Sequence, residues 1–121
     1  MEIREKIVTV DTTGEAGAAT GSGASQEING VLESIYIDYH ADAPATTDVT
    51  IAFGTRGGNI VVATSTRTAT LYVPVKQACG ADGAVIAGEY VKHILNQAIS
   101  VSVAQCDELT SAVTVYLRYS Q

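Results

Sequence analysis

Leu32-Glu33-Ser34-Ile35-Tyr36-Ile37-Asp38-Tyr39-His40 is the stretch of this 121-residue chain that decides the fold. Apolar and polar positions alternate along it, so that Ile35 and Ile37 share one side with Tyr39. The intervening Ser34, Tyr36 and Asp38 share the other side. A period of two residues is typical of a β-strand that is buried on one face. The stretch therefore predicts a half-buried strand.

The same alternation recurs along the chain at residues 49–53, 71–75, 99–104 and 113–119, and residues 58–63 fit another short strand. Residues 3–13 fit either a first strand or an extended N-terminal arm. The short connection between runs 99–104 and 113–119 predicts a hairpin. Short strands separated by turn residues at this spacing predict an all-β fold, an antiparallel β-sandwich or jelly-roll-like barrel of about eight strands. The length favours a single domain over residues 1–121.

Three segments interrupt the strand pattern. Residues 14–25, from Gly14 to Ser25, are nearly all small, and they fit either a mobile loop or a small-residue strand lying against another subunit. Residues 54–58 are glycine-rich but lack the Lys followed by Ser or Thr of a phosphate-binding loop, which favours a hairpin turn. Residues 89–97 fit one helical face, but their β-branched content favours a strand over a helical turn.

The charge balance excludes some classes of partner. Charged residues make up 17% of the chain, the formal net charge is −6, and Lys and Arg together number seven. Nucleic-acid binding requires clustered positive charge, so it is disfavoured. No apolar run is long enough to cross a bilayer, and residues 1–6 do not lead into a signal peptide. We expect a protein made in the cytoplasm, or exported only within something assembled there.

Few residues are candidates for chemistry. Asp38, His40 and Asp42 alternate, with Asp48 nearby, so they could point to one side of a strand and bind a divalent metal. Asp42 with Pro44 is also ordinary turn chemistry, and we favour that interpretation, with no metal site.

Catalytic groups have equally little support. His93 fits a strand residue facing solvent or a neighbouring subunit, and no Ser lies in a nucleophile elbow. Cys79 and Cys106 fit two partly buried thiols, with a disulfide as the alternative, and Lys76 is the only nearby cation in sequence that could activate a thiol. We therefore expect no enzyme activity and no cofactor.

Six tyrosines are spread over several predicted strands. They could form an aromatic platform for a sugar, although such residues more often line strand faces and subunit contacts. They are Tyr36, Tyr39, Tyr72, Tyr90, Tyr116 and Tyr119.

The order of these strands resembles that of a known group of proteins. Residues 28–39, 45–51, 99–104 and 112–117 are similar to the corresponding runs of small β-sandwich virion proteins of tailed bacteriophages, most of all capsid decoration or cement proteins. The resemblance covers the chain from about Gln26 onward and lies in style and order, without a signature motif.

The resemblance implies a non-enzymatic structural protein on the outer surface of the phage head. It would be made in the host cytoplasm, with the major capsid protein and its own copies as partners, in a homo-oligomer such as a trimer. Similar small proteins also serve at the neck, tail or fibre, and a carbohydrate-binding module is the alternative from a different class. From the extended, charge-alternating N-terminus we expect Ile3, Arg4 and Lys6 to contact the capsid or a sister subunit.

Overall fold

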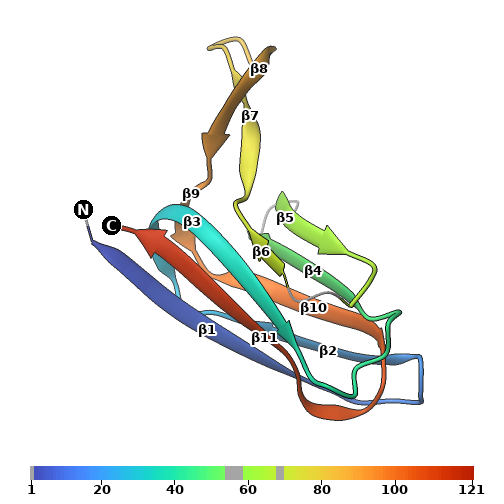
Figure 1. Ribbon diagram of the computed structural model, residues 1–121. Coiled ribbons are helices and arrows are strands. Elements are labelled where there is room, and N and C mark those ends of the chain that lie inside the picture. Colours follow the sequence, from blue (N-terminus) through green and yellow to red (C-terminus); the bar gives the residue numbers. More distant parts are fainter. Residues whose placement is uncertain (1, 54–58, 68–69) are drawn as a thin grey trace.

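Antiparallel strands form the whole described architecture. The structure is a computed structural model that describes residues 2–53, 59–67 and 70–121 (Figure 1). This part of the chain contains no helix, so the predicted all-β class is confirmed. Its strands are β1 (Ile3–Thr12), β2 (Ala19–Ala24), β3 (Ile28–Tyr39), β4 (Asp48–Phe53), β5 (Asn59–Thr64), β6 (Thr70–Tyr72), β7 (Val75–Cys79), β8 (Val85–Lys92), β9 (Ile94–Gln97), β10 (Ile99–Cys106) and β11 (Leu109–Ser120).

Two curled sheets lie one in front of the other and form a half-barrel (Figure 1). The five-stranded sheet has the order β1-β11-β3-β6, and β9 pairs with the first part of β3. The four-stranded sheet has the order β2-β10-β4-β5. Strands β7 and β8 pair only with each other among the described strands. We call the two large sheets the body and residues 75–92 the protruding hairpin.

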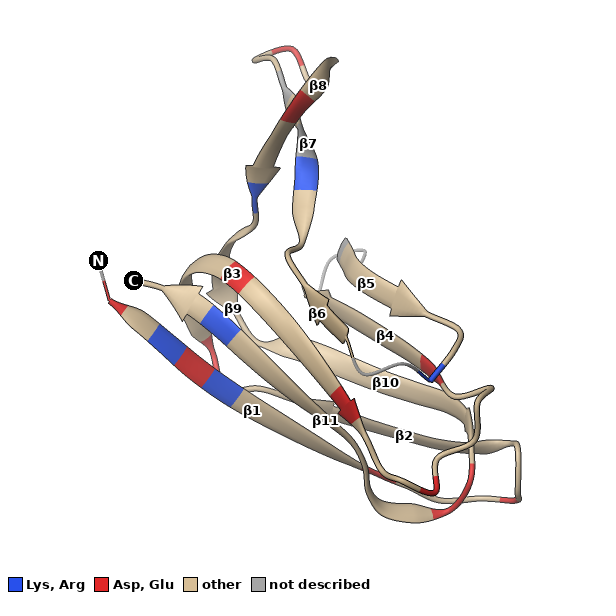
Figure 2. Cartoon of the chain, viewed as in Figure 1, with Lys and Arg blue, Asp and Glu red and all other residues tan. Residues whose placement is uncertain are grey.

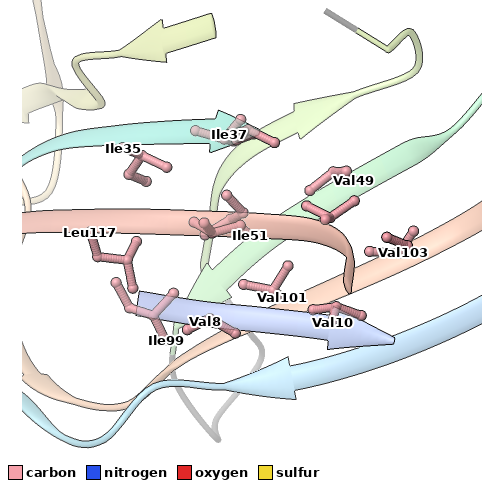
Figure 3. Close-up of a cluster of buried hydrophobic side chains, with 14 of the residues drawn as sticks. Val8, Val10, Ile35, Ile37, Val49, Ile51, Ile99, Val101, Val103 and Leu117 are labelled. Carbon is pink, nitrogen blue, oxygen red and sulfur yellow. The ribbon is translucent and has the colours of Figure 1, made fainter. Parts of the chain in front are cut away.

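The core lies between the inner faces of the two large sheets (Figure 3). Every second residue of each central strand points inward, as the alternation predicts. Val8, Val10, Ile35, Ile37 and Leu117 come from the five-stranded sheet, and Val49, Ile51, Ile99, Val101 and Val103 face them from the other sheet. β-Branched side chains dominate, which fits the strand propensity of these runs.

Strand β2 corrects both expectations for residues 14–25. It is a strand of the chain's own four-stranded sheet, paired with β10, and the Thr13–Thr20 bridge links its start to the end of β1. Its inward positions are Gly21 and Gly23, which lie against Val8 and Val10 of β1. The small residues let the edges of the two sheets approach each other, and this closes one side of the half-barrel.

The predicted hairpin between residues 99–104 and 113–119 is wrong. Strand β10 pairs with β2 and β4, whereas β11 pairs with β1 and β3 in the other sheet. The chain crosses between sheets at residues 107–108, after Gln105 takes a positive φ of 51° and the Cys106 side chain is buried. The Thr12 hydroxyl secures the crossing, because it donates to the Asp107 carbonyl (2.6 Å) and accepts from the Leu109 amide (3.1 Å).

Other boundaries also differ from the predicted ones. Residues 71–75 divide into β6 and β7, because the chain leaves the five-stranded sheet at the buried Pro74, which has no amide hydrogen to donate. Residues 89–97 are strands, as favoured over a helical turn, but they belong to two, β8 and β9. These divisions and β2 raise the described strands from the expected eight or so to eleven. The expected turn at residues 54–58 lies outside the described residues. Residues 3–13 form β1, an edge strand of the sheet.

The protruding hairpin points away from the body (Figure 1). All eight residues of β8 are exposed. Its base is attached at three places: Lys92 forms an ion pair with Glu33, the His93 carbonyl accepts from the Leu32 amide (2.9 Å), and the His93 ring packs edge-on against Phe53 (5.5 Å between centroids). The base of the hairpin is therefore fixed to the body. In the described structure, no other strand packs on β7 and β8 beyond this base.

Candidate functional site

A hollow on the outer face of the five-stranded sheet is the candidate site. It has a volume of about 410 Å³. Four strands meet there, and each contributes a side chain from the face opposite the core. The lining residues are Glu5, Ser34, Tyr36, Asp38, Leu71, Tyr116 and Arg118.

Strand register aligns four side chains across the outer face of the sheet, and three of them, Tyr116, Tyr36 and Leu71, line the hollow. Ile7 lies opposite Tyr116, Tyr116 opposite Tyr36, and Tyr36 opposite Leu71, so one row crosses four strands. We call these four residues the apolar row. Directly opposed side chains in a sheet contact each other. Leu71 is 61% exposed and Ile7 57%, so the row is open to a ligand.

The two central tyrosines of the row form an aromatic ring pair. The ring centroids of Tyr36 and Tyr116 lie 6.1 Å apart, with the planes tilted by 52°. This is within the range of favourable aromatic pairs. Their adjacent positions create an aromatic surface of the kind the sequence offered as one alternative.

Charges border this aromatic surface. Arg118 Nε donates to Glu5 Oε2 at 3.3 Å, which neutralises both groups. Asp38 has no ion-pair partner among the described residues, so the hollow carries one uncompensated negative charge. The described lining includes no His or Cys, so Ser34 has no partner base there. The arrangement suits binding of an amphipathic surface that carries a positive charge.

The expected contact residues at the N-terminus do not gather at one point. Ile3 lies on the outer face, like the hollow, whereas Arg4 and Lys6 lie on the opposite face of β1. Arg4 pairs with Glu2 (3.0 Å), and Lys6 Nζ donates to Gln26 (3.1 Å). Figure 2 shows the alternating charges of β1 beside strands that carry few.

The structure separates Asp38 from His40 and Asp42. Asp38 faces outward from β3, while His40 Nδ1 accepts the Asp42 amide (3.0 Å) in the following turn. The Asp42 carboxylate lies 3.9 Å from His40 Nδ1. In the described ranges, no three His, Cys, Asp or Glu side chains are placed to hold a metal. Cys106 is a buried free thiol, and the side chain of Cys79 is outside the description.

The sequence led us to expect that His93 faces solvent or a neighbouring subunit. The structure buries this side chain instead. It lies between β8 and β9, is 6% exposed, and its Nδ1 has no hydrogen-bond partner among the described residues. Burial lowers the pKa of His93, and nearby Lys76 lowers it further. Alternation alone could not locate this residue, because it sits where one strand ends and another begins.

The six tyrosines divide into three groups. Tyr36 and Tyr116 line the hollow, and Tyr90 is exposed on the protruding hairpin. The other three point toward the core: Tyr39, Tyr72 and Tyr119. Burial raises the pKa of Tyr39, whose hydroxyl lies 3.2 Å from that of Thr64.

The protruding hairpin is an exposed apolar surface that was not expected from the sequence. Apolar side chains are exposed along both of its strands, and they are Val75, Val85, Ile86, Tyr90 and Val91. One signal was available: apolar pairs such as Val85-Ile86 and Tyr90-Val91 break the alternation expected of a strand with one buried face.

Comparison with protein-family models, curated proteins and solved structures gives no match for this chain. Within the described residues, no helix is long and apolar enough to span a membrane.

Proposed function

We propose that the chain is a non-enzymatic structural component of a phage particle, and specifically a decoration protein that binds the outer surface of the capsid. The observation that carries this proposal is the pair of uncovered apolar surfaces, the apolar row and the protruding hairpin. Apolar surface that is contiguous and exposed usually marks a contact with another macromolecule. A protein that works by contacts needs such surfaces and needs no reactive groups.

The contact with the shell is assigned to the N-terminal half of β1. Ile3 is exposed there, and Lys6, which has no ion-pair partner among the described residues, adds a cation next to Arg4, which is paired with Glu2. A side chain that reaches beyond the sheet edge can contact a larger surface without disturbing the core. Neck, tail or fibre positions would use the same kind of contact.

Co-sedimentation with heads tests this role. If the chain is encoded beside a major capsid protein, heads assembled from that protein should bind it. Binding should weaken in the charge-reversed variant Arg4→Glu/Lys6→Glu and persist in Ser102→Asp, an exposed site on the other sheet. Heads that leave the wild-type chain in the supernatant would contradict the proposal.

A carbohydrate-binding module is the second candidate, favoured by the tyrosine pair in the hollow. Sugars stack on exposed aromatic rings, and Tyr36 with Tyr116 provides two rings in one depression. A glycan array tests it: binding that is lost in Tyr36→Ala and Tyr116→Ala would support this function. Absence of binding to any glycan on a broad array would reject the carbohydrate-binding function.

A further inference from the structure

Nothing in the described part of the chain packs over the protruding hairpin. A two-stranded hairpin is marginally stable by itself in water and needs packing against a further layer. Here every residue of β8 is exposed, and the large apolar side chains Val85, Ile86, Tyr90 and Val91 are 43% to 59% exposed. The chain's own hollow cannot supply this layer in the same copy, because the hairpin leads away from the body (Figure 1).

The surface area indicates how much has to be covered. The solvent-accessible surface area of the chain is 6906 Å². A folded monomer of this mass, 12.6 kDa, is expected to expose about 6,200 Å². The excess of roughly 700 Å² is close to the ~800 Å² that each partner contributes to a protein–protein interface of standard size. The excess, which is a property of the whole chain, is therefore similar in size to one partner's share of such an interface.

Charge indicates which partner fits. The hairpin holds two cations, Lys76 and Lys92, and two anions, Asp82 and Glu89, so it is neutral in a chain of formal charge −6. An acidic second copy would therefore not repel the hairpin through its net charge. Lys76 has no ion-pair partner among the described residues, and neither does Asp38 in the hollow.

The two surfaces also match in pattern. Val91 lies directly opposite Lys76 in the hairpin, so one hairpin face presents an aliphatic side chain beside a cation. Asp38 and Tyr36 lie on the same face of β3, so the hollow presents an anion beside an aromatic ring, with Leu71 opposite Tyr36.

We propose that the protruding hairpin of one copy docks into the hollow of a second copy, with its Lys76 and Val91 face against Asp38 and the apolar row. This proposal rests on the proposed structural role and names the contact between copies. Because hairpin and hollow are different surfaces, the contact is heterologous, and repetition of it gives a ring if the rotation closes.

Light scattering coupled to size exclusion tests the contact. The wild-type chain should elute as an oligomer. The hairpin variant Val91→Asp and the hollow variant Leu71→Asp should each elute at the monomer mass. Both positions are exposed, so the fold should survive, and circular dichroism checks it. The matched control Ser100→Asp, on the outer face of the other sheet, should remain oligomeric.

Mixing the two variants gives the decisive measurement. Val91→Asp keeps its hollow and Leu71→Asp keeps its hairpin, so an equal mixture should form a dimer and stop there. Lys76→Glu and Asp38→Lys should each weaken assembly, and the double variant should restore it.

A monomeric wild-type chain, or oligomers that persist in both single variants, would overturn the proposed contact. So would glycan binding at the hollow of the assembled protein. Binding to phage heads by a monomeric chain would leave the structural role standing while rejecting this contact, which separates the two proposals.

Discussion

Gly21 of β2 lies so close to the carbonyl oxygen of Asp11 in β1 that a Cβ atom at position 21 would overlap it. The same Cβ would lie 3.0 Å from a methyl group of Val10. Backbone cannot move aside as a flexible side chain can, so Gly21→Ala should push the two sheet edges apart. We expect a loss of about 1–3 kcal/mol in the free energy of unfolding, measured by chemical denaturation.

The matched control is Ser22→Ala on the same strand. Ser22 is exposed on the outer face of the four-stranded sheet, so this variant should change stability by less than about 0.5 kcal/mol. Equal stability of Gly21→Ala and the wild type would contradict the close approach of β1 and β2.

Thr12 should govern the crossing from β10 to β11. Its buried hydroxyl both donates to Asp107 and accepts from the Leu109 amide, so Thr12→Val removes both of these hydrogen bonds. A buried polar group that loses its partner costs about 1–3 kcal/mol. Thr12→Ser keeps the hydroxyl and should retain most of the stability. Similar denaturation midpoints for the two variants would show that the hydroxyl does not secure the crossing.

Alternation predicted most strands because it reports which side chains face the core. It does not report which sheet a strand joins. For this reason the sequence predicted a hairpin, whereas β10 and β11 lie in different sheets. Gln105 and Ser111 take positive φ values of 51° and 54°. Neither is a Gly or Asn, the residues that most readily take a positive φ, so the sequence did not distinguish a change of sheet from a hairpin turn.

The candidate site was less predictable than the fold. Tyr36 and Tyr116 were both candidates for an aromatic platform, but their pairing depends on the register between β3 and β11, which are far apart in sequence. The hollow also needs Glu5 from β1 and Leu71 from β6, residues that gave no signal of their own. In β2, the small residues indicated either a mobile loop or a strand against another subunit, whereas their physical cause is the close contact with β1 of the same chain.

Glu33 should stabilise the base of the protruding hairpin in a pH-dependent way. Hydrogen bonds from Lys92 and then Ser120 hold the pKa of Glu33 below its ordinary value. A lowered carboxyl pKa contributes stability above the unfolded pKa, and this contribution is lost as pH falls through the folded pKa. Glu33→Gln should therefore be less stable than the wild type at neutral pH, and thermal unfolding curves should converge in acid. A constant difference at all pH values would contradict the assignment.

His93 should make the chain less stable as the solution is acidified from neutral pH. Its pKa is lowered in the folded chain by burial and then by Lys76, so the unfolded chain takes up a proton on this imidazole at the higher pH. Uptake by the unfolded state favours unfolding, and the loss begins near the ordinary histidine pKa of about 6.5. His93→Phe keeps an aromatic ring against Phe53 but cannot be protonated. The free energy of unfolding of the wild type should fall more steeply between neutral and mildly acidic pH than that of the variant, while the carboxyl groups common to both chains cancel in the difference. Parallel curves would show that the imidazole is not desolvated, and the packing of the hairpin base on Phe53 would then have to be revised.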